Sequence, residues 1–204
     1  MTKNVGPAPG RRARLGCCAA ALAFAPGSAS AHVGLGRTHG LVQGFFHPLS
    51  GSDHVLAMVA VGLFAAQLGG RALWLLPSSF IAVMAFAAAA GLAGVGLPFV
   101  EIGIALSLVA LGSAIALRSR LPTLAAMALV GFFAMFHGYA HGAETPESTS
   151  GLLYGAGFIC ATALLLTIGV GSGLAIGRAA HRGRLVQVGG AAIAIAGLAI
   201  LASP

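Results

Sequence analysis

Two histidines and a glutamate close a long apolar segment of the chain. His137, His141 and Glu144 lie in the run Phe136–Glu144. On a helix they occupy positions i, i+4 and i+7, so two imidazoles and a carboxylate share one face within two turns. Imidazole nitrogen and carboxylate oxygen form a ligand set for a divalent transition metal. The alternative is hydrogen bonding between helices, but ionisable groups are costly in a membrane segment and normally mark a site or a pathway.

A second cluster, His47, Asp53 and His54, lies at the start of an earlier apolar segment. On a straight helix the two histidines share a face, while Asp53 points about a third of a turn away. Pro48 removes a backbone donor and Gly51 permits other dihedrals, so a straight helix is not expected here. A kinked or broken start brings the three side chains together, as half-helices do in transporter sites. The alternative role for these residues is hydrogen bonding that holds helices together.

The composition is that of a membrane protein. Of the 204 residues, 58% are hydrophobic and only 7% are charged, with a mean hydropathy of +0.95. In ordinary soluble domains about a quarter of residues are charged. We therefore expect an all-α, polytopic integral membrane helix bundle whose surroundings are the lipid bilayer. The net charge of +7 does not indicate a nucleic-acid partner, because the basic residues fall near the N-terminus and at the ends of apolar runs.

The chain divides into a leader and one transmembrane domain. Basic residues precede a short apolar run from Leu15 to Ala25, and Ala29-Ser30-Ala31 follows, which predicts a secretory signal peptide over 1–31. The remaining residues, 32–204, contain six apolar segments of about 20 residues, each long enough to cross about 30 Å of hydrocarbon as a helix. The six transmembrane helices are expected near 45–68, 72–95, 98–117, 121–143, 151–176 and 185–202.

Connecting loops that contain arginine alternate with loops that contain none. Arginine occupies the first, third and fifth loops of the mature chain, at Arg71, Arg118, Arg120, Arg178, Arg182 and Arg184. The second loop carries no charge, and the fourth carries Glu144 and Glu147. The positive-inside rule makes the arginine loops cytoplasmic. We therefore expect a bacterial inner (plasma) membrane protein with both mature termini in the periplasm, which a cleaved signal peptide also requires.

This orientation brings both clusters to the outer side of the membrane. The first helix would run inward and the fourth outward, so their histidines and acids lie at similar depth. Glu101, near the outer start of the third helix, is added on depth alone and otherwise fits a solvated acid. His32 and His39, near the new N-terminus, either capture a metal ion or belong to a solvated tail. We predict one metal-binding vestibule that faces outward.

At these residues the sequence resembles the HupE/UreJ family of membrane proteins associated with hydrogenase and urease maturation. The family signatures are His-x5-Asp-His in the first mature helix and Phe-His-Gly-x-Ala-His-Gly-x-Glu in the fourth, and His47–His54 and Phe136–Glu144 match both. The resemblance implies a nickel or cobalt permease with a cleaved signal peptide. It assigns metal-site roles to His47, Asp53, His54, His137, His141 and Glu144.

Three functions are compatible with the same residues. The leading hypothesis is a permease, not an enzyme, with no cofactor and with Ni2+ or Co2+ as the transported ion; Zn2+ suits the ligands as well. Cytoplasmic metal chaperones of hydrogenase or urease maturation are the expected partners. The second hypothesis is a membrane-embedded zinc-dependent hydrolase that uses Glu144 or Asp53 as general base. The third is a haem-binding membrane subunit with histidine axial ligands.

Overall fold

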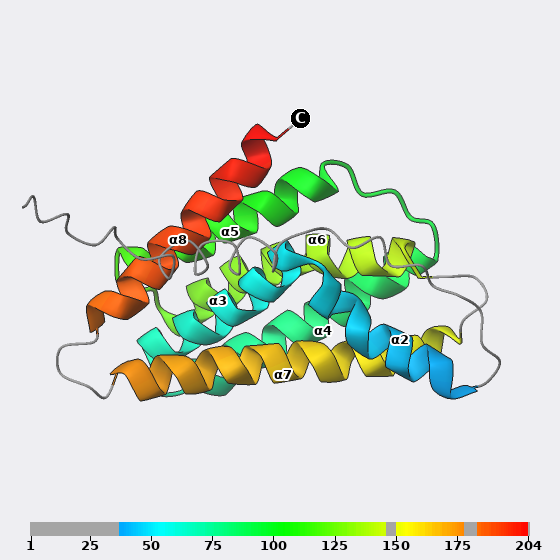
Figure 1. The fold of residues 1–204 in the computed structure, drawn as a ribbon, viewed down its shortest axis with the longest axis horizontal. Helices are drawn as coiled ribbons and strands as arrows, with labels where there is room; N and C mark the ends of the chain where they lie inside the picture. The colour runs from blue at the N-terminus through cyan, green and yellow to red at the C-terminus, as the bar shows by residue number, and fades with distance from the viewer. Residues whose placement is uncertain (1–36, 146–149, 178–182, 204) are drawn as a thin grey trace, which may run out of the picture. The chain divides into compact units, whose positions relative to one another are not determined.

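The described part of the chain is entirely helical. The computed structural model describes residues 37–145, 150–177 and 183–203, all within one compact unit, Leu35–Pro204. Every regular element in these ranges is an α-helix (Figure 1), which confirms the predicted class. The helices are α2 (Arg37–Ser50), α3 (Ser52–Leu68), α4 (Ala72–Leu92), α5 (Val100–Ala116), α6 (Thr123–Ala143), α7 (Gly151–Gly177) and α8 (Gly183–Ala202). The predicted signal peptide and His32 lie outside the described residues.

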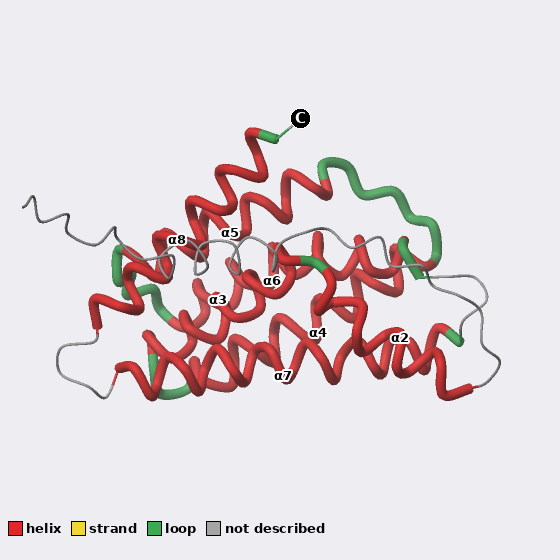
Figure 2. The backbone as a smooth tube through the Cα atoms, viewed as in Figure 1, coloured by secondary structure: helices red, strands yellow, loops and turns green. Residues whose placement is uncertain are grey.

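The six predicted segments all coincide with helices, and the first is broken. α2 begins at Arg37 rather than near residue 45, and α3 continues from Ser52 at an angle of 83° to α2. Figure 2 shows the short non-helical break between them. Pro48 lies in the last turn of α2 and cannot donate a backbone hydrogen bond, and Gly51 is extended, with φ −94° and ψ 116°. The kink that Pro48 and Gly51 predict is therefore present.

Helix length bears on how many segments cross the membrane. α4, α6, α7 and α8 are long and apolar enough to span it, and the bent α2–α3 pair would add a fifth span. α5 is apolar but has 17 residues, about 25 Å at 1.5 Å per residue, which is shorter than a typical hydrocarbon core. The fold is that of a helical membrane protein, and the crossing number of six stays a prediction.

Glycines let the helices approach one another closely. A Cβ added at Gly138 or Gly142 of α6 would collide with the backbone carbonyls of Met84 and Ala88 on α4. Similar collisions would occur between other helix pairs, at Gly44 and Gly157 for α2 and α7, Gly62 and Gly169 for α3 and α7, and Gly112 and Gly190 for α5 and α8. Small residues drive helix association in membranes in this way. The pairing of α4 with α6, and of α2 and α3 with α7, follows from these contacts.

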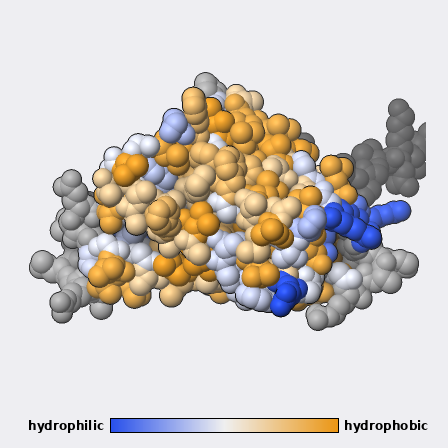
Figure 3. All heavy atoms as spheres, turned by 180° about the vertical axis from the view of Figure 1, so that it is seen from behind, coloured by the Kyte–Doolittle hydropathy of each residue, from blue (hydrophilic) through white to orange (hydrophobic). Residues whose placement is uncertain are grey.

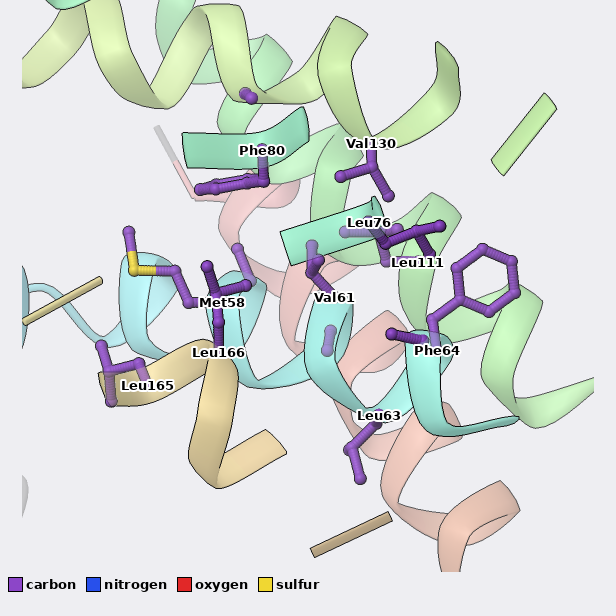
Figure 4. Close-up of a cluster of buried hydrophobic side chains, with 14 of the residues drawn as sticks. Met58, Val61, Leu63, Phe64, Leu76, Phe80, Leu111, Val130, Leu165 and Leu166 are labelled. Atoms are coloured by element: carbon purple, nitrogen blue, oxygen red, sulfur yellow. The ribbon is translucent and has the colours of Figure 1, made fainter. Parts of the chain in front are cut away.

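A tightly packed apolar core fills the bundle behind the histidines. Figure 4 shows side chains from α3, α4, α5, α6 and α7 pointing toward one another. Fully buried members of this core include Met58, Val61, Phe64, Leu76, Phe80, Leu111 and Val130. Large apolar side chains also face outward, with Leu152 89% exposed and Phe86 78% exposed. A surface of this kind suits lipid rather than water.

The arginines of the α3–α4 and α5–α6 loops and of the start of α8 gather at the end of the bundle away from the histidines. The Gln67 side-chain amide donates to the Ser119 carbonyl, which joins the end of α3 to the loop that carries Arg118 and Arg120. Gln187 donates to the Ala116 carbonyl, so the start of α8 lies at the same end. α6 begins just beyond this loop and carries His141 and Glu144 at its other end. Figure 3 likewise shows a largely hydrophobic face with the most hydrophilic residues toward one end.

Candidate metal centre

The break between α2 and α3 positions two histidines and one aspartate. His47 lies in the last turn of α2, while Asp53 and His54 lie in the first turn of α3. The Asp53 carboxylate accepts hydrogen bonds from the His54 backbone amide at 2.9 Å and from His54 Nδ1 at 3.1 Å. A carboxylate is also favourable at a helix N-terminus, where the backbone dipole is positive. The break therefore orients the His54 ring with its Nε2 atom directed away from Asp53.

The spacing of His137 and His141 works together with the glycines that follow them. His137 is fully buried and His141 is 4% exposed, on the same side of α6. Gly138 and Gly142 each lie next to a histidine and contact the α4 backbone. The glycines of the Phe136–Glu144 motif therefore let α6 pack on α4. This packing turns the histidine face of α6 toward α2, α3 and α7.

Four imidazole rings from three helices meet in one cluster. The ring centroids of His54 and His141 are 4.0 Å apart, those of His54 and His137 are 4.8 Å apart, and those of His47 and His141 are 4.8 Å apart. His141 and His54 thus lie between His47 and His137 in the cluster. The His141 ring also packs on Phe158 of α7 at 4.2 Å between centroids.

The outer side of the cluster contains a carboxylate. His47 Nε2 donates to Glu144 Oε2 at 3.1 Å, with the Glu144 side chain 58% exposed and the His47 side chain 28% exposed. One possible ligand atom from each of His47, His141 and Glu144 lies within 4.8 Å of the others. We call these three residues the mouth triad. Small movements of the three side chains would bring these ligand atoms close enough to bind a single ion.

The inner side of the cluster is formed by His54 and His137, which we call the inner pair. His137 Nε2 lies 2.9 Å from the hydroxyl of Ser107 on α5. Among the described residues, the buried ring nitrogens without a hydrogen-bond partner are His54 Nε2, His137 Nδ1 and both nitrogens of His141. Buried polar atoms without partners are rare and costly. A neutral imidazole has one nitrogen with a free lone pair, so these three adjoining rings offer up to three nitrogen ligands to a cation.

A cavity adjoins the cluster between α4, α6 and α7. It measures about 610 Å³, and the residues on its walls are mostly apolar, with four alanines, two leucines, Phe158 and Ile159 among them. His141 and Tyr154 are on the wall, and the Tyr154 hydroxyl is buried without a hydrogen-bond partner. His141 therefore borders this apolar space as well as the other two residues of the mouth triad.

The structure brings together six of the residues singled out from the sequence and leaves Glu101 apart from them. His47, His54, His137, His141 and Glu144 adjoin one another, and Asp53 reaches the cluster through His54. Glu101 is exposed on the first turn of α5, six residues or about 9 Å along the helix from Ser107, and has no contact with the cluster. His39 lies on α2 two turns before His47, its side chain undescribed, and His32 lies outside the described residues.

Sequence reasoning missed Ser107 and Tyr154. Ser107 is a single hydroxyl in an apolar helix, and only its contact with His137 separates it from the other serines of the chain. Tyr154 contacts the cluster because Gly44 lets α2 lie against the Tyr154 backbone, which brings the His47 ring centroid to 5.7 Å from the phenol ring. Neither contact has a local sequence signal, since each joins residues far apart in the chain.

Comparison with known proteins gives a consistent result. The chain matches the family described as HupE / UreJ protein over residues 20–200. It is similar to Protein HupE of Rhizobium leguminosarum bv. viciae, with 46% identity over 183 residues, which are 89% of this chain and 94% of that protein. No solved structure matches the chain.

Proposed function

Because the chain belongs to the HupE / UreJ protein family, which is associated with nickel and cobalt transport for hydrogenase and urease, we propose that it is a permease for divalent transition-metal ions. The proposed cargo is Ni2+ or Co2+, taken from the periplasm to the cytoplasm. The observation that carries the proposal is the group of buried imidazole nitrogens without partners on His54, His137 and His141. Neutral imidazole nitrogen is a ligand for both ions.

The mouth triad supports capture of a cation from the outside. The C-terminal ends of α2 and α6 meet there, since His47 is in the last turn of α2 and Glu144 caps α6. Helix C-termini carry a partial negative charge, and Glu144 adds a full one. An ion that approaches exchanges some of its waters for Glu144 oxygen and for imidazole nitrogen of His47 and His141. We propose that this exchange is the first step of transport.

The inner pair supports a second binding position deeper in the protein. His141 belongs to the mouth triad and also lies next to His54 of the inner pair. An ion can therefore move from Glu144 and His47 to His54 and His137 without losing all protein ligands. At the inner position the ligands are imidazoles alone. Giving up the anionic ligand weakens binding and favours release, as passage through a transporter requires.

The route inward is closed in this conformation. Met58, one turn after His54, and Phe80, whose ring centroid is 6.0 Å from that of His137, are fully buried. Release to the cytoplasm therefore needs a movement of the helices that parts this apolar core. We place the arginine end of the bundle in the cytoplasm by the positive-inside rule, with six membrane crossings in which α2 and α3 form the first and α5 crosses as a short helix. Cytoplasmic metal chaperones would then receive the ion.

Uptake of radioactive nickel and cobalt by cells that lack their own transporters tests the proposal. Cells with the wild-type protein should accumulate at least one ion, and His54→Ala should return uptake to the level of cells without the protein. His181→Ala, which changes a histidine of the α7–α8 connection, serves as the matched control and should transport normally. Wild-type cells that accumulate neither ion, with the protein present in the membrane, would refute the permease function.

A further inference from the structure

The hydroxyl group of Ser107 lies between a backbone carbonyl and a candidate metal ligand. Ser107 is fully buried on α5, and its Oγ lies 2.6 Å from the Ile104 carbonyl oxygen and 2.9 Å from His137 Nε2. Both distances are within hydrogen-bond range. A serine hydroxyl has one proton to donate, so only one of these two contacts can use it.

The short contact with Ile104 decides where that proton lies. Two oxygens 2.6 Å apart repel each other unless a proton lies between them, and the Ile104 carbonyl has no proton of its own. The Ser107 hydroxyl therefore donates to Ile104 and accepts from His137. His137 must carry its ring proton on Nε2, which leaves a lone pair on Nδ1.

His137 Nδ1 is the ring atom that has no partner in the cluster. It is buried without a hydrogen bond, in a ring whose centroid is 4.8 Å from that of His54. His54 is held in a matching way, because its Nδ1 donates to Asp53 and its unpartnered atom is Nε2. Each member of the inner pair thus gives one nitrogen to an oxygen acceptor and keeps the other available. Such acceptors orient metal-binding histidines and set their tautomers.

We infer that Ser107 is a positioning residue of the transport site: it holds His137 in the tautomer that presents Nδ1 to the ion. This inference rests on the proposed function, because it assigns the freed lone pair to metal binding. Ser107 does not touch the ion. It acts through His137, as Asp53 acts through His54, and it joins α5 to a cluster whose other members come from α2, α3 and α6.

The tautomer is measured directly in ion-free protein. In detergent-purified protein labelled with 15N-histidine, nitrogen NMR distinguishes a protonated ring nitrogen from an unprotonated one, and His137→Gln identifies the His137 signals by their loss. We expect the wild-type His137 ring to carry its proton on Nε2. A proton on Nδ1 would overturn the inference, whatever any variant does.

Two substitutions then connect the tautomer to transport. Ser107→Ala removes the acceptor, so His137 should become a mixture of tautomers and the maximal rate of nickel uptake should fall by about 10–100-fold, the usual cost of losing such a partner of a metal ligand. Ser107→Thr keeps the hydroxyl and should restore both properties if the added methyl fits. Ser79→Ala is the matched control, because Ser79 donates to the Leu76 carbonyl at 2.9 Å with the same three-residue spacing but, among the described residues, bonds to no histidine.

The outcomes separate this inference from the proposed function. Wild-type protein that transports neither ion refutes the function, while the NMR spectrum still reports the Ser107–His137 bond. Protein that transports nickel equally well with serine or alanine at position 107 overturns the positioning role alone. A fall in the maximal uptake rate for Ser107→Ala that Ser79→Ala reproduces would also overturn it, because the effect would then come from losing a hydrogen bond between a serine side chain and the backbone of its own helix.

Discussion

The mouth triad contains a carboxylate, Glu144, and the inner pair has one beside it, Asp53, in a different environment. Glu144 at the mouth is mostly exposed and contacts His47 across two helices, whereas Asp53 is half-buried and contacts the histidine next to it in the chain. The exposed carboxylate is free to turn toward an ion, and the half-buried one is committed to orienting His54. We therefore propose that burial and hydrogen bonding, rather than residue type, make Glu144 a metal ligand and Asp53 a support for His54.

The largest effect is expected where the two groups meet. His141→Ala removes the ring that adjoins both His47 and His54, and uptake should fall to the level of cells without the protein. Radioactive nickel uptake at equal membrane abundance is the measurement. Transport near the wild-type rate would show that the two groups do not work in sequence through His141.

The next prediction separates capture from passage. His137→Gln should lower the maximal uptake rate at all nickel concentrations, because every ion must pass the inner pair. Glu144→Gln should instead raise KM on the order of tenfold with a nearly unchanged maximal rate, because a neutral mouth still admits ions at high concentration. Uptake measured over a wide range of nickel concentrations distinguishes the two. Equal changes in rate and KM for both variants would contradict the division into mouth and inner pair.

The two carboxylates should differ in their response to amide substitution. Asp53→Asn keeps an oxygen that accepts from His54 Nδ1, so it should retain most of the affinity for nickel. Asp53→Ala removes that oxygen and should lose about 10–100-fold in metal affinity. Nickel binding to purified protein by calorimetry gives both values. If Asp53→Asn is as damaging as Asp53→Ala, then Asp53 is a direct ligand and the comparison with Glu144 fails.

The smallest effect is expected at the break between α2 and α3. A Cβ at Gly51 would lie 2.9 Å from Asp53 Oδ1 and 3.2 Å from His54 Nδ1, so Gly51→Ala should displace their hydrogen bond. We expect it to lower the maximal rate of nickel uptake by up to about tenfold, which is less than the effect of Asp53→Ala. Gly155→Ala is the matched control, because a Cβ there meets nothing within 4 Å. Equal uptake kinetics in the two variants would mean that the Asp53–His54 geometry is not critical.

Much of the fold could be predicted because membrane helices are long apolar runs with polar ends. The predicted boundaries at 72, 143 and 151 agree with α4, α6 and α7, since Gly, Pro and charged residues mark those ends. The predicted start of the first helix, residue 45, was wrong by two turns. Residues 37–44 include polar side chains and so do not read as part of an apolar run, but they form a helix that packs along α7 through Gly44 and Gly157. That packing is a tertiary contact, so hydropathy alone does not reveal it.

Part of the candidate site, like part of the fold, could be predicted from the sequence. By itself the sequence determined which residues have metal-binding chemistry, that His137 and His141 share a helix face, and that Pro48 and Gly51 break the helix before Asp53. Only the tertiary structure decided that His141 and His54 lie between His47 and His137, that Glu101 lies apart and that Ser107 contacts His137. The physical reason is that residue type and helical periodicity are local properties, whereas a hydrogen bond between helices depends on where glycines such as Gly138 and Gly142 let their backbones meet.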